Sequence, residues 1–249
     1  MMRMTDTVKH LLIINVLMFA GTFFIEQNEL FFRLFALYFP KNELFQPWQV
    51  LTHMFMHGGV QHILFNMFAL WMFGTAVEQV FGRTKFITFY LLAGFGAAAL
   101  QIAYYYLNYS PIEAELITTG LSQSEIVEML STNEITKTIT DAQKLQLQEL
   151  FPVFNSVMVG ASGAIMGILV AFGMLFPNSQ LMLIFLPIPI KAKYFIPGII
   201  ALDLFSALTG VSIFSPSNTA YIAHIGGALT GFIMMYFWKK NQFDKYRWN

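Results

Sequence analysis

The chain is dominated by long runs of apolar residues that carry few or no charges. A helix needs about 20 such residues to cross the hydrocarbon core of a bilayer, and six runs approach that length. They cover residues 10–26, 60–80, 86–107, 157–176, 195–213 and 220–238. Only 11% of all residues are charged, against about 25% in a typical soluble domain. Because lipid cannot satisfy an open backbone, the runs predict helices. We therefore expect an all-α integral membrane protein with six spans.

Lysine and arginine predict which side of the membrane each loop faces. With six spans, both termini lie on one side. If that side is the cytoplasm, its segments hold ten of the 14 basic residues and the opposite side holds four. The positive-inside rule therefore predicts that both termini are cytoplasmic. No small-residue cleavage site follows the first run, so it is interpreted as a retained span. We expect a multi-pass protein of a bacterial inner membrane.

The outer side carries two long loops. Residues 27–59 mix large apolar and charged side chains, which indicates an amphipathic segment at the bilayer interface. Residues 108–156 form the extended polar stretch of the chain, and the pieces 123–130 and 141–150 have helical spacing. We interpret residues 1–249 as a single membrane domain with a polar insertion at about 108–156, which contains two short acidic helices.

Composition also limits the partners and cofactors. The formal net charge is zero and cysteine is absent, so nucleic acid is not an expected partner, and disulfides, Cys-ligated zinc and a thiol nucleophile are excluded. His53 and His57 are four residues apart, but Met54 stands where the metalloprotease pattern needs glutamate. We expect no metal and no cofactor, and a monomer in the lipid bilayer.

Strongly polar side chains inside a span are costly and mark function by default. In this chain they are His62, Asn66, Glu78, Ser162, Asp203 and His224. Ser162 lies about five residues into its run and His224 about four, so both are expected about 6–8 Å below the outer helix ends. His62 and Asn66 are four apart and share one helix face. Three helices thus bring four polar side chains to one shallow layer.

Glycines beside these residues predict close helix packing. Gly163 and Gly167 follow Ser162, Gly227 and Gly231 follow His224, and Gly160 comes just before Ser162. Small residues four apart let helix backbones approach closely in lipid. Such an approach would allow the distance of about 2.6–3.2 Å that proton transfer between serine and histidine requires.

The residue types then suggest acyl-transfer chemistry. A serine hydroxyl is a poor nucleophile until a base such as neutral His224 takes its proton. His62, Asn66 and the backbone N–H of Ser162 can donate hydrogen bonds to an oxyanion, each worth about 2.7–4 kcal/mol in the transition state. Glu78 is expected at the cytoplasmic end and Asp203 near mid-membrane. No carboxylate is therefore expected to orient His224, and a two-residue dyad is predicted.

Together these motifs resemble the rhomboid family of intramembrane serine proteases. The resemblance is carried by His62-xxx-Asn66, Gly160-Ala161-Ser162-Gly163, Ala223-His224-xx-Gly227-xxx-Gly231 and the stretch from Trp48 to His57. It implies Ser162 as nucleophile, His224 as general base, and His62 with Asn66 around the oxyanion. It also implies transmembrane protein substrates that are cut near the outer surface. Gln49 and Met166 depart from the family, which often has arginine and an aromatic residue there, and the insertion is not part of the minimal pattern.

Other functions use the same residues. Ser162 alone is more often a small residue at a helix contact, and His224 alone more often packs in the core or lines a pore. A catalytically inactive rhomboid-like protein that binds membrane proteins or serves quality control is one alternative. A transporter is another, although transporters favour polar groups near the midplane. Asp203 is open between a structural hydrogen bond and gating. The fifth span and the loop 214–218 are the expected moving parts.

Overall fold

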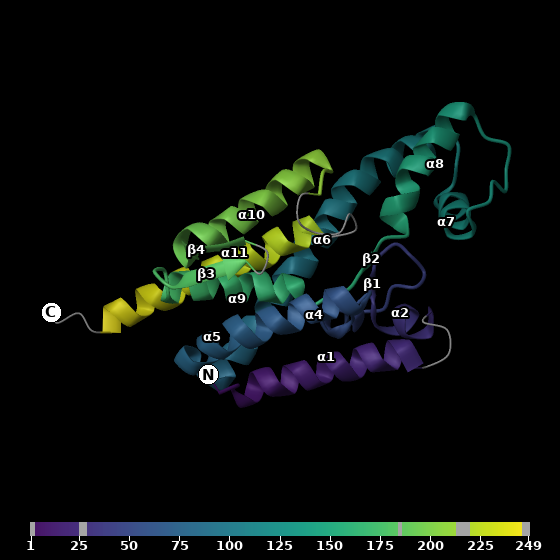
Figure 1. The fold of residues 1–249 in the computed structure, drawn as a ribbon. Coiled ribbons are helices and arrows are strands. Elements are labelled where there is room, and N and C mark those ends of the chain that lie inside the picture. The colour runs from purple at the N-terminus through teal and green to yellow at the C-terminus, as the bar shows by residue number, and fades with distance from the viewer. Residues whose placement is uncertain (1–2, 25–28, 184–185, 213–219, 246–249) are drawn as a thin grey trace.

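The computed structural model describes residues 3–24, 29–183, 186–212 and 220–245 and consists mainly of helices (Figure 1). Within these residues, five helical stretches are long and apolar enough to cross a membrane. They are α1 (Asp6–Phe24), the stretch Val60–Phe81 formed by α4, η2 and α5, α6 (Arg83–Thr118), α10 (Ala192–Thr209) and the first part of α11 (Tyr221–Lys245). α4 covers Val60–Ala69, η2 Leu70–Gly74 and α5 Thr75–Phe81.

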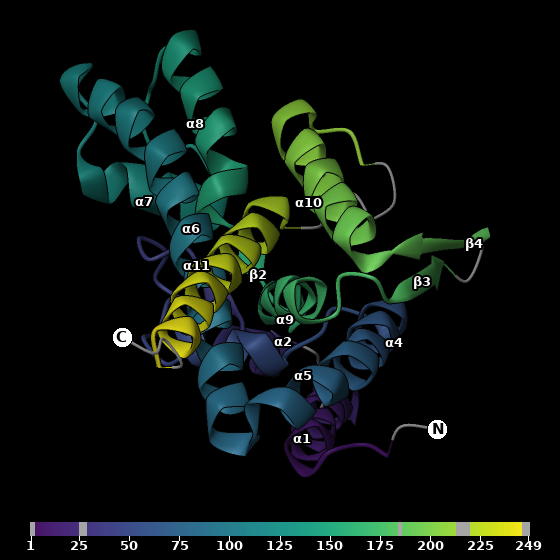
Figure 2. The same cartoon turned by 90° about the vertical axis from the view of Figure 1, so that its left-hand side faces the viewer.

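The fourth predicted run forms a shorter helix at the centre of the bundle. α9 (Ser162–Leu175) has 14 residues and is about 21 Å long, less than the hydrocarbon thickness of about 30 Å. All residues from Gly163 to Phe172 are buried. Figure 2 shows α9 nearly end-on, with the other helices around it. Protein rather than lipid therefore surrounds this helix.

The predicted start of this helix was wrong. We expected the run to begin at 157, but the backbone there is extended, and β2 (Val157–Met158) pairs antiparallel with β1 (Leu37–Tyr38). Gly160 then adopts a φ of 127°, which a side chain strongly disfavours. The helix starts only at Ser162, so the serine is its first residue and not the fifth or sixth.

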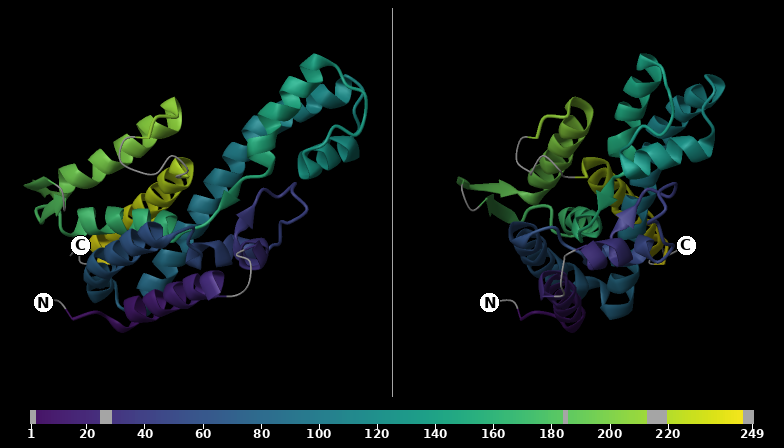
Figure 3. Two further views of the ribbon diagram at one scale, coloured as in Figure 1. Left: turned by 45° about the vertical axis from the view of Figure 1, so that its right-hand side comes forward. Right: turned by 90° about the vertical axis from the view of Figure 1, so that its right-hand side faces the viewer.

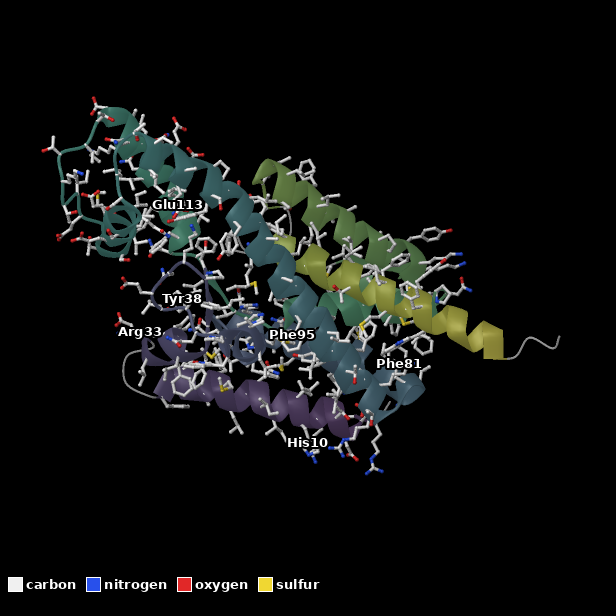
Figure 4. The ribbon with its side chains drawn as sticks, turned by 180° about the vertical axis from the view of Figure 1, so that it is seen from behind. His10, Arg33, Tyr38, Phe81, Phe95 and Glu113 are labelled. Carbon is white, nitrogen blue, oxygen red and sulfur yellow. The ribbon has the colours of Figure 1, made fainter. Side chains whose placement is uncertain are left out.

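The segment after α1 is held by hydrogen bonds to one buried side chain. It contains α2 (Glu29–Phe35), β1, α3 (Gln49–Thr52) and the 3₁₀ turn η1 (His53–Phe55), and Figure 4 labels Arg33 and Tyr38 within it. The Gln49 side chain accepts from the N–H groups of Tyr38 and Gln46 and donates to the carbonyls of Arg33 and Leu44. Gln49 thus organises the segment at a position where the resembled family often has arginine.

The polar insertion folds as a helical unit beyond the bundle (Figure 3). α6 runs on to Thr118, past the predicted end at 107, and α7 (Gln123–Thr132) and α8 (Asp141–Phe154) pack against its extension. Its core consists of aromatic and aliphatic side chains. They are Phe39, Tyr109, Leu116, Leu121, Ile126, Met129, Leu130, Leu147, Leu150 and Phe154. The end of the molecule that carries α7 and α8 is called the insertion end below.

The opposite end holds the start of α1 and the end of α11 (Figure 1). It also holds the strand pair β3 (Gln180–Leu183) and β4 (Leu186–Lys191). The carboxylate of Glu78 accepts hydrogen bonds from the Thr5 hydroxyl and from the N–H groups of Thr7 and Val8. It therefore caps the first turn of α1, where N–H groups lack partners within the helix. Glu78 was expected to be structural, but to bond its own loop or Arg83.

Candidate active site

Ser162 stands at the insertion end of α9, directly after an irregular loop. The loop is fixed by the Gly160 N–H, which donates to the carbonyl of His53 at 2.9 Å. As the first residue of α9, Ser162 has a backbone N–H without a partner in its own helix, at the positive end of the helix dipole. The hydroxyl and a free N–H are thus presented from the same residue.

His224 lies three residues after the start of α11 and reaches Ser162 directly. Its Nε2 is 2.8 Å from the Oγ of Ser162. This distance is within the range of about 2.6–3.2 Å expected for a nucleophile and its base. A serine and a histidine 62 positions apart in the sequence are therefore brought into one hydrogen bond.

Contacts between glycine backbones on α9 and α11 position the pair. A Cβ added to Gly227 would overlap the carbonyl oxygen of Gly163, and one added to Gly231 would lie 2.7 Å from the Cα of Gly167. At both places the main chains of the two helices touch, so no side chain separates them. One turn before this contact surface, α9 presents Ser162 and α11 presents His224.

α6 completes this tightly packed core from a third side. A Cβ on Gly163 would lie 2.5 Å from the Cβ of Ala97, and one on Gly226 would lie 2.7 Å from the carbonyl oxygen of Gly96. Close backbone approach of this kind is the usual way in which helices associate in lipid. The sequence prediction included the glycines of α9 and α11 but not this face of α6.

His62 and Asn66 approach the site from α4. A Cβ on Gly160 would lie 2.8 Å from the Nε2 of His62, so the imidazole contacts the loop that precedes Ser162. Asn66 is buried one turn further along, and its Nδ2 has no hydrogen-bond partner among the described residues. A buried donor without a partner costs about 1–3 kcal/mol and calls for a functional explanation. Both side chains can therefore offer N–H donors beside Ser162.

Two further histidines support this arrangement. His57 is buried, and its ring packs edge-on against that of His62 with centroids 5.0 Å apart. The Nδ1 of His53 bonds the carbonyl of Gln49 at 2.8 Å, and burial lowers the pKa of His53 to about 4. His53 is thus neutral near pH 7 and connects the Gln49 segment to the Gly160 loop. In the described residues, no three or more potential metal-ligating side chains gather at one place.

The expectation that no carboxylate reaches His224 was wrong. An oxygen of Asp203 on α10 lies 2.9 Å from the Nδ1 of His224. The prediction failed because it ended the helix at 213, whereas Gly210 takes a left-handed conformation (φ 71°) and ends α10 at Thr209. Asp203 is therefore six residues from that end, about 9 Å, and His224 about 4.5 Å from the start of α11. Side chains can bridge a difference of this size.

One sequence signal could have identified Asp203. It is a carboxylate inside an apolar helix, and such a group needs a partner. Glu78, the other intramembrane carboxylate, is occupied by the start of α1. The predicted mobile loop 214–218 lies outside the described residues.

Comparison with known proteins agrees with the site. A family model described as the Rhomboid domain matches residues 44–241. The Rhomboid protease AarA of Providencia stuartii is 26% identical over 194 residues, which is 74% of this chain and 53% of the relative. Rhomboid protein 1, mitochondrial, of Saccharomyces cerevisiae is 24% identical over 189 residues, 76% of this chain and 40% of the relative.

A shorter match is more similar in sequence. The Rhomboid protease GluP of Bacillus subtilis is 47% identical over 47 residues, 19% of this chain and 9% of the relative. The chain thus spans about half or less of the length of these curated relatives. The family model covers well over half of the chain and includes all the residues described at the site. The chain is a multi-pass membrane protein that belongs to the rhomboid family.

Proposed function

We propose that the chain is an intramembrane serine endopeptidase that uses Ser162 as nucleophile and His224 as general base. The observation that carries the proposal is the 2.8 Å hydrogen bond between the Oγ of Ser162 and the Nε2 of His224. A serine hydroxyl with an imidazole in this position is the arrangement that activates serine in hydrolases.

The chemical steps follow from the donors around Ser162. Its Oγ attacks the carbonyl carbon of a substrate peptide bond while the Nε2 of His224 takes the hydroxyl proton. The same imidazole then gives that proton to the leaving amine, which leaves an acyl-serine for hydrolysis by water. The backbone N–H of Ser162, the Nδ2 of Asn66 and the imidazole of His62 donate to the oxyanion. The unpartnered Nδ2 of Asn66 supports this role.

The short central helix supports a cleavage position below the membrane surface. α9 has 14 residues and covers about 21 Å of a hydrocarbon layer of about 30 Å. If its far end reaches the cytoplasmic face, Ser162 lies several ångströms beneath the outer one. The proposal includes six spans, counting α9, with both termini in the cytoplasm, in accord with the positive-inside rule.

The substrate class follows from this location. A peptide bond at this depth belongs to another membrane-spanning helix, whose carbonyls are engaged in its own backbone hydrogen bonds. The substrate must therefore unwind locally before attack. Small or helix-breaking residues near the cut lower the cost of unwinding.

The test is cleavage of a model transmembrane substrate by purified protein in detergent or liposomes, together with labelling by a fluorophosphonate probe. Ser162→Ala should abolish both signals, and His224→Ala should abolish labelling. Ser110→Ala, at an exposed serine on the insertion part of α6, is the matched control and should change neither. Cleavage that persists in Ser162→Ala would reject the nucleophile. Wild-type protein that neither labels nor cleaves would instead favour a catalytically inactive binding protein.

A further inference from the structure

We infer that Asp203 is a positioning residue that fixes the imidazole of His224 in the orientation and tautomer needed to accept the Ser162 proton. This inference rests on the proposed function and extends it, because it replaces a dyad with a Ser162–His224–Asp203 triad. The observation is that one imidazole is bonded on both sides, at 2.9 Å to Asp203 and at 2.8 Å to Ser162.

The two contacts together determine where the imidazole proton lies. Neutral imidazole has one N–H donor and one bare nitrogen acceptor. An ionised carboxylate can only accept, so the Nδ1 that faces Asp203 carries the proton. The Nε2 is then bare, and it accepts the hydroxyl proton of Ser162. The alternative tautomer would turn an N–H toward Ser162 and prevent general-base catalysis.

Burial makes this contact more than a surface ion pair. The side chains of His224 and Asp203 are 13% and 9% exposed. A carboxylate in an apolar helix is costly unless it is paired, and a protein gains nothing in the membrane by placing one opposite its base unless the pairing is used. The same carboxylate also stabilises the imidazolium that forms when His224 takes the proton.

The contact links the base to a helix that is held differently from its neighbours. α9 and α11 touch through glycine backbones, whereas α10 buries only four of its 18 residues, Ala192, Ile196, Asp203 and Ser206. Its other side exposes large apolar side chains such as Leu204, Phe205 and Leu208. Figure 3 shows α10 at the side of the bundle. The alignment of His224 therefore depends on α10 lying against α11.

The experiment compares Asp203→Asn with wild type and with Ser206→Ala, a matched control. Ser206 is buried on the same helix, one turn after Asp203, and has no part in the proposed chemistry. Cleavage of a transmembrane peptide gives kcat and KM, thermal inactivation reports stability, and ¹⁵N NMR of histidine-labelled protein reports the tautomer of His224. The resonance of His224 is identified by its loss in His224→Ala.

For Asp203→Asn we expect kcat to fall by up to about 10⁴-fold, as when aspartate is replaced by asparagine in the Ser-His-Asp template. KM should stay within about twofold and thermal inactivation should not change, because the amide keeps the size of the carboxylate. His224 should shift from the Nδ1–H tautomer toward the Nε2–H tautomer, since an amide can donate to Nδ1. Ser206→Ala should keep the wild-type kcat and tautomer.

Two results would overturn the inference. One is a kcat for Asp203→Asn within about threefold of wild type, and the other is an unchanged Nδ1–H tautomer in that variant. A fall in kcat that accompanies an equal loss in Ser206→Ala would also count against it, since it would indicate only weakened packing of α10. If the wild-type protein neither cleaves nor labels, the proposed function fails, and the tautomer comparison alone then decides the role of Asp203.

Discussion

The centre of the bundle and the polar insertion are both made of helices, but they are held together by different means. In the centre, α9 and α11 meet at Gly163, Gly167, Gly227 and Gly231, and main chain touches main chain. In the insertion, α6, α7 and α8 surround large side chains such as Tyr109, Leu150 and Phe154. α7 and α8 also begin with complete capping boxes.

The difference follows from the solvent around each region. Between helices in lipid there is little hydrophobic driving force, so association depends on close van der Waals contact, which small residues allow. The insertion has the polar surface of a soluble protein, where burial of apolar area stabilises the fold. A backbone contact leaves little freedom in the spacing of two helices. The proposed catalytic pair is therefore attached to the more rigid of the two constructions.

The two regions are joined near the segment that follows α1. The Nδ2 of Asn42 donates to the carbonyl of Phe154 at 3.0 Å, and Lys41 forms an ion pair with Glu113; Figure 4 labels Glu113 on the extension of α6. The pairing of β1 with β2 leads from there to Gly160. The insertion thus contacts the loop that precedes the serine, but it does not enter the α9–α11 contact surface.

The largest effect is expected from a side chain placed between α9 and α11. In Gly227→Ala the new Cβ would overlap the backbone of Gly163, so the helices must separate. Overpacking of a tight core costs about 1–3 kcal/mol or more, and the hydrogen bond between Ser162 and His224 should be lost. We expect fluorophosphonate labelling to be abolished and the thermal inactivation temperature to fall.

The matched control is Gly198→Ala on α10, where an added Cβ meets nothing within 4 Å. That variant should label like wild type. Normal labelling of Gly227→Ala would contradict the claim that backbone contact sets the position of the proposed catalytic pair.

A cavity in the insertion should have a large but local effect. Ile126 is fully buried in the insertion core, and Ile126→Ala should cost about 2–5 kcal/mol. Amide hydrogen exchange should accelerate over α7 and α8, while labelling at Ser162 stays normal. Leu145→Ala, at a side chain that is 66% exposed, should change neither. If Ile126→Ala also abolished labelling, the two regions would form one cooperative unit.

The sequence predicted the features that depend on residue type and spacing. Apolar runs predicted the bundle, and the motifs around Ser162 and His224 predicted a contact that the structure contains at 2.8 Å. Hydropathy could not predict where a helix ends inside an apolar run. The start of α9 is set by the strand pairing of Val157 and the positive φ of Gly160, and neither changes the hydropathy.

Long-range polar contacts were the other failure. Asp203 contacts His224 through the relative position of α10 and α11, which depends on packing and not on either helix alone. Gln49 was identified only as a departure from the resembled family, yet it makes four hydrogen bonds that organise its segment. The extension of α6 to Thr118 was missed because its outer part is amphipathic and not continuously apolar.

The smallest effect is expected at a cap on the surface of the insertion. The Ser122 hydroxyl accepts from the N–H of Glu125, and the Glu125 carboxylate accepts from the N–H of Ser122 and from Lys137. The bond from the Ser122 backbone is the main cause that lowers the pKa of Glu125 to about 2. The box is therefore intact above about pH 4.5, and its contribution is lost only as the pH falls from there toward 2.

Ser122→Ala removes one half of this box and should cost about 1 kcal/mol, enough to increase exchange of the α7 amides about fivefold at pH 7 and too little to change cleavage. Ser110→Ala, an exposed serine inside α6 that caps no helix, is the control and should leave α7 protected. An unchanged exchange rate in Ser122→Ala would mean that core burial alone holds α7. Faster exchange confined to α7 would show that the insertion relies on the local signals of a soluble domain, which the glycine contacts of the bundle do without.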